Sequence, residues 1–420
     1  REPYHGAFHD LFPSWKEFWA SRPDKDELPQ VAAPAPLEQF LKTMRRGTPA
    51  PRMRVRQGAG MSQTLFTPIQ LGKIALQNRV VMAPMTRNRA DADGTPTDIM
   101  AEHYGQRADA GLIVAEGAWP EVTGQAYCRQ PGIETAAHVR GWRRVTDAVH
   151  ARGGSIVLQI MHSGRIGSSH IKPAGVRSVS ASAIQAQGKI WTDAAGMQDF
   201  DQPQALTTEE VRKAIAGHAA AARRAMDAGF DGVELHGTSG YLSLQFLHSS
   251  TNQRTDEYGG NASSRSRFAV ECLGSMGEAI GIDRVGLRLN PGNTFNDTAD
   301  ENSAATHAEL MRQAARLGIA YLHVMRAVFD PSIDAFKLAR ENFGENLILN
   351  DGFDAQSAEA ALQAGEGKAV SFARHFIANP DLVQRMRQGL PLARFDRNTL
   401  YTPGARGYND YASAEEVQTV

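Results

Sequence analysis

The chain has little of several features that would each point to a particular class of protein. Only two of its 420 residues are cysteines, Cys128 and Cys272, and they lie far apart without CxxC spacing. They favour a reduced, cytoplasmic compartment and argue against a disulfide framework or a thiolate metal site. No apolar run approaches the roughly 18 residues that a membrane-spanning helix needs. No charged and then apolar N-terminus predicts a signal peptide.

An excess of charge of either sign is also missing. Lysine and arginine number 45 against 46 acidic residues, so the formal net charge is −1. This balance argues against nucleic acid or an anionic membrane as a partner. No GxGxxG motif follows a strand-like run, which argues against a doubly wound dinucleotide fold. The remaining expectation is an enzyme-sized protein that acts on a small molecule.

The first 60 residues differ in composition from the rest. Aromatic residues recur at helical spacing from Phe8 to Trp19, and five prolines between Pro29 and Pro51 then interrupt the chain. This composition ends near Met61. We therefore predict an N-terminal extension over 1–60 and a catalytic unit over 61–420. The extension is interpreted as a linker, or as a docking segment or remnant of a fused upstream domain.

From Met61 onward, short apolar runs alternate with amphipathic stretches. This alternation is typical of parallel strands covered by helices, and eight such units predict an α/β fold, the (β/α)8 TIM barrel. The predicted strands span 79–85, 111–117, 155–162, 232–237, 284–290, 321–326, 346–352 and 369–374. The predicted helices span 98–109, 135–152, 208–228, 263–280, 303–317, 357–364 and 381–388.

Polar residues stand at the carboxyl ends of these strands, which share one mouth in such a barrel. The set contains few carboxylates and no histidine pair at metal spacing, which argues against a metallohydrolase. It contains no strand-end lysine, which argues against an aldolase. Its amide and guanidinium donors suit a flat, phosphorylated cofactor. The candidates are Thr86, Arg87, Glu116, Gln159, His162, His236, Ser239, Tyr241, Arg288, Asp351 and Arg374.

Several ordered segments resemble one family. The stretch 231–260, DGVELHGTSGYLSLQFLHSSTNQRTDEYGG, resembles the signature region of the Old Yellow Enzymes, FMN-dependent ene-reductases. The segments APMTR, LQIMHSGR, RLNPGNTFND, LNDGFD and SFARHFIANPDL resemble the same family in the same order. The resemblance covers about residues 64–411. It implies a non-covalently bound FMN that NAD(P)H reduces.

The resemblance also implies roles for individual residues in cofactor binding. It places Thr86 near the flavin carbonyl O4, Gln159 at the pyrimidine edge and Arg288 near N1 and O2. The phosphate falls to the ends of the last two strands, at Gly352 and Arg374. The full set of implied FMN-binding residues is Ala83, Pro84, Met85, Thr86, Gly117, Gln159, Arg288, Asp351, Gly352, Ala373 and Arg374.

The implied reaction is the reduction of an activated C=C bond in an α,β-unsaturated carbonyl or nitro compound. His236 would hydrogen-bond the substrate oxygen, and Tyr241 would protonate the α-carbon. Tyr408 is assigned to substrate contact. Ser239 stands where the family carries a second Asn or His. The hypothesis is that small enones bind more weakly as a result, and the alternative is that Ser239 hydrogen-bonds only locally.

Other interpretations remain open. Taken singly, Arg288 or Arg374 could form a structural salt bridge, and Tyr241 could be a core aromatic. Ala373 replaces a common glycine, and the acid Asp351 stands close to the expected phosphate. The alternative functions are a nitroester or nitroaromatic reductase on the same flavin, and a flavin-binding module that docks a partner through residues 1–60. A homo-oligomer is a further hypothesis.

Overall fold

Eight parallel strands close into a barrel, as the sequence predicts. The computed structural model describes residues 64–418, and the predicted N-terminal extension lies outside them. The strands follow the closed order β10-β11-β12-β13-β14-β3-β4-β5. Their bounds are β3 Val80–Met82, β4 Leu112–Ala118, β5 Ile156–Ile160, β10 Gly232–Gly237, β11 Val285–Leu289, β12 Tyr321–Met325, β13 Leu347–Asn350 and β14 Ala369–Phe372.

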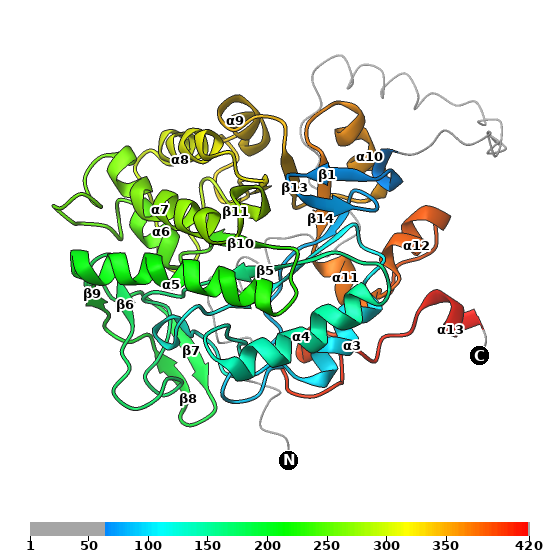
Figure 1. Cartoon of the computed structure of the whole chain (residues 1–420), viewed down its shortest axis with the longest axis horizontal. Helices are drawn as coiled ribbons and strands as arrows, with labels where there is room; N and C mark the ends of the chain where they lie inside the picture. Colours follow the sequence, from blue (N-terminus) through cyan, green and yellow to red (C-terminus); the bar gives the residue numbers. More distant parts are fainter. Residues whose placement is uncertain (1–63, 419–420) are drawn as a thin grey trace, which may run out of the picture. The chain divides into compact units, whose positions relative to one another are not determined.

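Helices follow the strands and cover the outside of the barrel (Figure 1). Several begin with hydrogen-bonding caps that satisfy free backbone N–H groups, and Thr135, Thr207 and Asp354 each form a reciprocal capping box. The main helices are α3 Asp98–Gln106, α4 Ala136–His150, α5 Thr208–Asp227, α7 Ala262–Ile280, α8 Ser303–Leu317, α9 Ala335–Asn342, α10 Ala355–Gln363 and α12 Leu382–Gln388.

The sequence prediction lacked three of the short helices. Helix α9 lies between the sixth and seventh strands, begins after the capping residue Asp334 and has only eight residues. Helices α6 (Leu242–Leu247) and α11 (Arg374–Ala378) are shorter still. Segments this short show too few turns for a 3.6-residue period to stand out from their surroundings. The sequence prediction therefore missed short helices, but its fold class is correct.

A hairpin packs against the amino ends of the strands. It consists of β1 (Ile69–Leu71) and β2 (Ile74–Leu76), and its Lys73 N–H donates to the carbonyl of Asp283, just before β11. Its apolar side chains join a buried cluster that is separate from the larger one between strands and helices. The members of the separate cluster are Leu71, Ile74, Leu76, Val81, Leu112, Val114, Val157, Ala320, Tyr321, Ile348 and Ala369. The hairpin thus stabilises the end of the barrel opposite the mouth.

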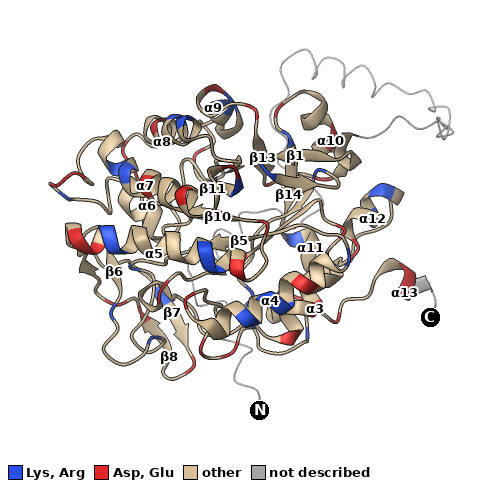
Figure 2. Ribbon diagram, in the orientation of Figure 1, with Lys and Arg blue, Asp and Glu red and all other residues tan. Residues whose placement is uncertain are grey.

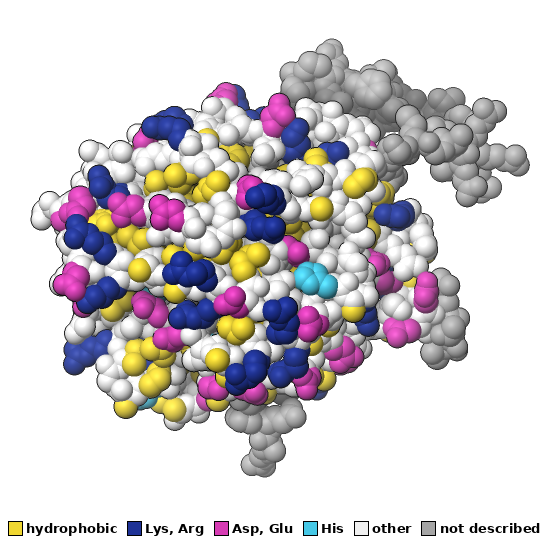
Figure 3. All heavy atoms as spheres, in the orientation of Figure 1, with side chains coloured by type: hydrophobic (Ala, Val, Ile, Leu, Met, Phe, Trp, Pro, Cys, Tyr) yellow, Lys and Arg dark blue, Asp and Glu magenta, His cyan; other side chains and the backbone are white. Residues whose placement is uncertain are grey.

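A long segment between β5 and α5 carries two small sheets near the end of the barrel that forms the mouth. Strand β6 (Val179–Ser180) pairs with β9 (Gln204–Ala205), and β7 (Lys189–Thr192) pairs with β8 (Gly196–Asp199). Acidic and basic residues alternate along the ribbon (Figure 2), and their side chains are interspersed over the face in view (Figure 3). Among the described residues, no helix is long and apolar enough to cross a membrane.

Candidate active site

The strand register brings the predicted site residues to one end of the barrel. Strand β10 pairs with β11 so that His236 stands beside Arg288, and it pairs with β5 so that Glu234 stands beside Gln159. Because side chains alternate along a strand, Glu234 and His236 share the inward face, with Glu234 one step deeper. The mouth therefore holds His236 above a buried carboxylate.

His236 and Tyr241 lie against each other. Their ring centroids are 4.9 Å apart and their planes meet at 81°. The backbone N–H of Thr238 donates to His236 Nδ1 over 3.3 Å. Since Nδ1 accepts a hydrogen bond, the neutral imidazole carries its hydrogen on Nε2. Burial, and next the charge of Arg288, lower the pKa of His236 to about 3, so the ring is neutral near pH 7.

Tyr241 is held by polar neighbours that sequence reasoning missed. Its hydroxyl lies 2.7 Å from the hydroxyl of Tyr127, and Asn296 also hydrogen-bonds its side chain. Burial raises the pKa of Tyr241 to about 12, which keeps the phenol protonated. The electrostatic effect of Tyr401, which lies nearby, also raises the pKa of Tyr241. Tyr127 and Tyr401 stand in loops without strand or helix periodicity, and no sequence signal marked them.

Ser239 has a backbone conformation that suits asparagine. Its φ of 57° lies in the left-handed region, which Asn adopts more readily than most residues. Its hydroxyl lies 3.0 Å from that of Thr238, and its carbonyl accepts a hydrogen bond from Asn296 Nδ2 at 2.8 Å. The local hydrogen bond that the sequence left as an alternative is therefore present. Ser239 remains partly exposed beside His236.

A buried polar network lies beneath the mouth. Glu234 is fully buried and accepts hydrogen bonds from Gln159 Nε2 at 2.8 Å, from His323 Nδ1 at 2.9 Å and from the Tyr321 hydroxyl at 3.2 Å. His323 Nε2 lies 2.7 Å from the hydroxyl of Ser371. Burial opposes the ionisation of Glu234, but the hydrogen bonds from His323 and Gln159 and the charge of Arg288 leave its pKa below the ordinary value. Burial lowers the pKa of His323, so the pair is a carboxylate and a neutral imidazole.

At the mouth, this network leaves polar groups that have no hydrogen-bond partner within the described residues. Gln159 gives its amide N–H to Glu234, so its carbonyl oxygen is turned to other partners. Arg288 donates through one terminal nitrogen to Asn350 Oδ1 at 2.8 Å. Its Nε is buried and has no hydrogen-bond partner among the described residues. An amide acceptor beside an unpaired guanidinium donor fits the N3–H and O2 edge of a flavin.

The ends of β13 and β14 form the other side of the mouth. Asp351 and Gly352 have φ values of 84° and 77°, so the chain turns sharply there, and Gly352 is exposed. Ala373, which replaces a common glycine, has a φ of −99°, an ordinary value for alanine, so the replacement does not strain the backbone. Arg374 is partly exposed and begins α11. The turn and Arg374 suit an anionic group.

The first two strands contribute backbone and small side chains. Pro84, Met85 and Thr86 follow β3 and are partly exposed, whereas Ala83 is buried. A Cβ on Gly117 would lie 2.8 Å from Met161 Sδ, so only glycine fits there. These positions agree with a flat group lying over the mouth, although none of them marks its chemistry alone.

The structure does not support Tyr408 as a substrate contact. Its side chain is fully buried and stacks on His103 with ring centroids 3.9 Å apart. Arg87 and Arg89 lie over the ring at 5.2 and 5.0 Å. With no exposed surface, the residue serves the packing of the C-terminal segment onto α3.

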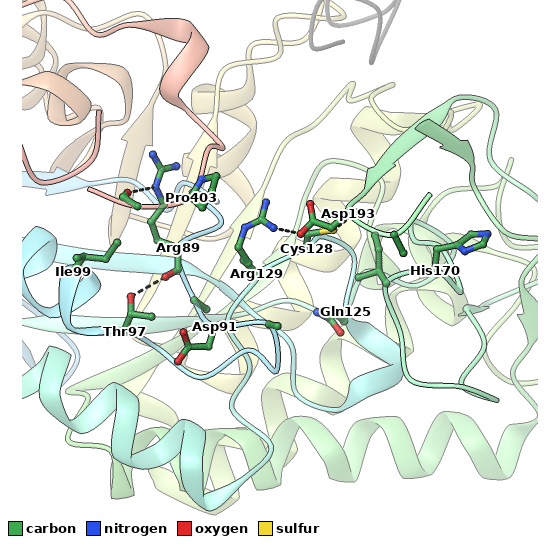
Figure 4. A pocket seen from close by; sticks show the side chains of 15 residues that line it. Arg89, Asp91, Thr97, Ile99, Gln125, Cys128, Arg129, His170, Asp193 and Pro403 are labelled. Atoms are coloured by element: carbon green, nitrogen blue, oxygen red, sulfur yellow. Dashed lines mark hydrogen bonds and ion pairs between the residues drawn. The ribbon is translucent and has the colours of Figure 1, made fainter. Parts of the chain in front are cut away.

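A cavity of about 450 Å³ lies next to this site but is not lined by His236 or Tyr241. Cys128, the neighbour of Tyr127, contributes to its wall, and Arg129 forms an ion pair with Asp193 across it (Figure 4). Arg89 and Pro403 lie on another side (Figure 4). The loop that carries Tyr127 therefore separates the cavity from the strand-end residues.

The fold and the donor set define a flavin-dependent oxidoreductase of the barrel type. Comparison with family models identifies the particular family. Residues 64–393 match the model of the NADH:flavin oxidoreductase / NADH oxidase family. The chain belongs to this family, which uses FMN, and within it to the Old Yellow Enzymes.

Individual relatives agree with this assignment. A probable flavin mononucleotide-dependent alkene reductase of Leishmania infantum is 43% identical over 352 residues, covering 83% of this chain and 96% of the relative. The structure of morphinone reductase is 38% identical with a TM-score of 0.80, and the match covers 86% and 99% of the two chains. The old yellow enzyme of Trypanosoma cruzi is 35% identical with a TM-score of 0.80, covering 84% and 99%.

Proposed function

We propose that this protein is an FMN-dependent ene-reductase in which His236 binds and Tyr241 protonates the substrate. The observation that carries the proposal is the contact of a neutral imidazole with a protonated phenol, next to the unpaired donor of Arg288. When bound, FMN supplies the hydride that it takes from NAD(P)H. The chain's own residues bind the acceptor, polarise it and deliver the proton.

The neutral state of His236 determines how it acts on the substrate. With its hydrogen on Nε2, the ring can donate one hydrogen bond to a carbonyl or nitro oxygen without carrying a charge. Such a bond withdraws electron density from the conjugated C=C bond and stabilises the negative charge that develops on the oxygen. The β-carbon thereby becomes a better hydride acceptor.

Tyr241 has the protonation state that a general acid needs. A pKa of about 12 keeps the hydroxyl hydrogen in place throughout the neutral range. As Tyr241 gives its proton to the α-carbon, the hydroxyl of Tyr127 at 2.7 Å can donate to the resulting phenolate. This donation would limit the cost of the buried negative charge.

One anaerobic experiment tests the proposal. The purified protein should show the absorption of oxidised flavin, lose it on addition of NAD(P)H, and regain it with cyclohexenone or maleimide. Reoxidation by these enones, with one equivalent of saturated product, is the expected result. Bleaching without any reoxidation by an enone or nitroalkene would contradict the assignment.

A nitroester or nitroaromatic reductase on the same flavin is the second candidate. It would need little from Tyr241, since no carbon is protonated. The protonated and well-held phenol favours the ene-reductase. The choice between NADPH and NADH is a separate question, and comparing the KM values of the two nucleotides answers it directly.

The role of the N-terminal extension also remains a proposal, because residues 1–63 lie outside those that the structure describes. We retain the hypothesis of partner docking or self-association through residues 1–60. A chain without these residues should then keep its turnover but change its oligomeric state or partner binding. Unchanged turnover and an unchanged sedimentation profile would leave a linker as the better interpretation.

A further inference from the structure

Glu234 is a fully buried carboxylate to which the proposed reaction assigns no part. It stands on β10 two residues before His236, and alternation along the strand puts both side chains on the inner face. Its Oε1 accepts a hydrogen bond from Gln159 Nε2 at 2.8 Å, and its Oε2 accepts from His323 and Tyr321. The carboxylate is therefore one side chain away from the place where we expect the pyrimidine edge of FMN.

An apolar layer closes the barrel beneath this carboxylate. Residues of the polar network stand two positions after members of the separate buried cluster, so alternation places each polar side chain above an apolar one. The pairs are Val157 with Gln159, Tyr321 with His323, Ile348 with Asn350 and Ala369 with Ser371. Hydrocarbon below the carboxylate and its complete burial leave little water to screen its charge. The charge of Glu234 therefore acts strongly on groups at the mouth.

The same carboxylate determines which way the Gln159 amide points. An ionised carboxylate only accepts hydrogen bonds, so it takes the NH2 group of Gln159 and leaves the amide oxygen for the mouth. A neutral amide at position 234 could accept or donate, and it would not specify this orientation. Because Glu234 is an acid, Gln159 presents an acceptor to the N3–H of a flavin.

Glu234 also opposes the charge of Arg288. Arg288 stands on β11, between the strands that carry Glu234 and His323. Burial lowers the pKa of Arg288, and the charges of Glu234 and then of Asp351 oppose that effect. A nearby negative charge disfavours the addition of electrons to a flavin, whereas a positive charge favours it. Glu234 and Arg288 should therefore shift the reduction potential of a flavin at the mouth in opposite directions.

We infer that Glu234 is a positioning residue that, acting through Gln159 and against the charge of Arg288, lowers the reduction potential of bound FMN. A lower potential makes the reduced flavin a stronger hydride donor toward an enone. The inference rests on the proposed function, in which Gln159 and Arg288 meet the pyrimidine edge of FMN. Glu234 itself touches neither substrate nor the reacting atoms.

The test replaces Glu234 with Gln in the FMN-loaded protein. The amide keeps the length of the side chain and can still accept from Gln159, but it removes the charge. Anaerobic titration against a redox dye of known potential measures the equilibrium constant for two-electron reduction. In E234Q this constant should rise about tenfold, the order that one unit charge about 10 Å away produces at an effective dielectric constant of about 20. That factor corresponds to about 30 mV, and an unchanged potential would overturn the inference.

Tyr321→Phe provides a matched control. The hydroxyl of Tyr321 donates to Glu234 Oε2 at 3.2 Å, so this variant also removes a hydrogen bond from the network, but the carboxylate and its contact with Gln159 remain. Both variants should lower the melting temperature, because each disturbs a buried polar group. Only E234Q should shift the flavin potential. Equal shifts in the two variants would show that Glu234 acts through packing alone.

Arg288→Gln supplies a test of sign. R288Q should lower the equilibrium constant for reduction, opposite to E234Q, and the double variant should return it towards the wild-type value because both charges are gone. Shifts of the same sign in the two single variants would contradict the inference.

The double variant also serves if E234Q alone does not fold, because it removes the guanidinium that E234Q leaves without its counter-charge. The double variant should then be reduced about tenfold more readily than R288Q. Equal potentials in R288Q and the double variant would rule out an effect of Glu234 on the flavin. A wild-type protein that holds no flavin would instead refute the proposed function.

Discussion

Two histidines on the inner side of the barrel differ in how fully they are hydrogen-bonded. His323 is completely buried, and each of its nitrogens has a close partner, Glu234 at 2.9 Å and Ser371 at 2.7 Å. His236 lies at the mouth and is partly exposed, and its contacts with Thr238 are 3.3 and 3.4 Å long. Both rings are neutral, so the two histidines do not differ in charge.

The same contrast extends to their neighbours. The network around Glu234 satisfies its carboxylate with three donors, whereas Arg288 at the mouth keeps a buried Nε without a partner among the described residues. A buried polar group without a partner costs free energy unless a ligand supplies one. The satisfied network is therefore a structural element, whereas Arg288 Nε at the mouth is a donor that a bound ligand would satisfy.

The largest effect is expected at the mouth. Replacing Tyr241 with Phe removes the proton donor, so reoxidation of the reduced enzyme by cyclohexenone should slow by ~10²–10⁴-fold. Reduction by NAD(P)H and the melting temperature should change little, because the phenyl ring still packs. Stopped-flow measurement of the two half-reactions separates these effects. Tyr127→Phe, which removes only the neighbouring hydroxyl, should slow reoxidation far less. Equal losses in both variants would show that Tyr241 is not the donor.

Substitutions in the buried network around Glu234 should lower the stability of the folded protein. His323→Ala leaves the buried Glu234 carboxylate without one partner and creates a cavity, so the free energy of unfolding should fall by about 3–5 kcal/mol. Ser371→Ala removes the hydroxyl that contacts His323 Nε2 and the Leu349 carbonyl, both neutral partners, and should cost about 1–3 kcal/mol. Urea unfolding curves measure both. A His323→Ala variant as stable as the wild type would remove the distinction between the two histidines.

Substitutions of Ser239 can strengthen substrate binding at the mouth. Asparagine accepts the left-handed backbone at this position and would bring an amide donor closer to the substrate oxygen. We expect Ser239→Asn to lower the KM for cyclohexenone roughly tenfold while the melting temperature stays within a degree or two. Ser239→His tests the same idea with a larger donor, and Ser239→Ala controls for loss of the local bond. If neither donor variant binds enones more tightly, the local role of Ser239 is sufficient.

The smallest effect concerns His218, which belongs to neither group. Burial lowers its pKa from 6.5 to about 4, so the folded state keeps it neutral while the unfolded state binds a proton below pH 6.5. Folding is therefore opposed as the pH falls from 6.5 towards 4, by at most about 1.4 kcal/mol per pH unit for this one group. His218→Gln should reduce the pH slope of the unfolding free energy in that window. An unchanged slope would mean that His218 is protonated in the folded protein.

Much of this architecture could be predicted because it depends on local pattern. All eight barrel strands lie within the predicted runs or overlap them closely, since buried parallel strands are continuously apolar. The first strand ends early, at Met82, because Pro84 has no N–H to continue the ladder. The failures concern longer-range packing: Tyr408 was assigned to the substrate, yet the chain folds it onto His103.

The sequence alone determined the barrel, because it depends on periodicity within single strands and helices, and its resemblance to the Old Yellow Enzymes implied the flavin and the pairing of His236 with Tyr241. Tertiary structure decided which polar groups are satisfied. The bond between Glu234 and His323 joins residues 89 positions apart, and it forms because β10 and β12 belong to the same closed barrel. Hydrogen bonds are matched in space and not along the chain, so only the fold separates a structural histidine from one that awaits a ligand.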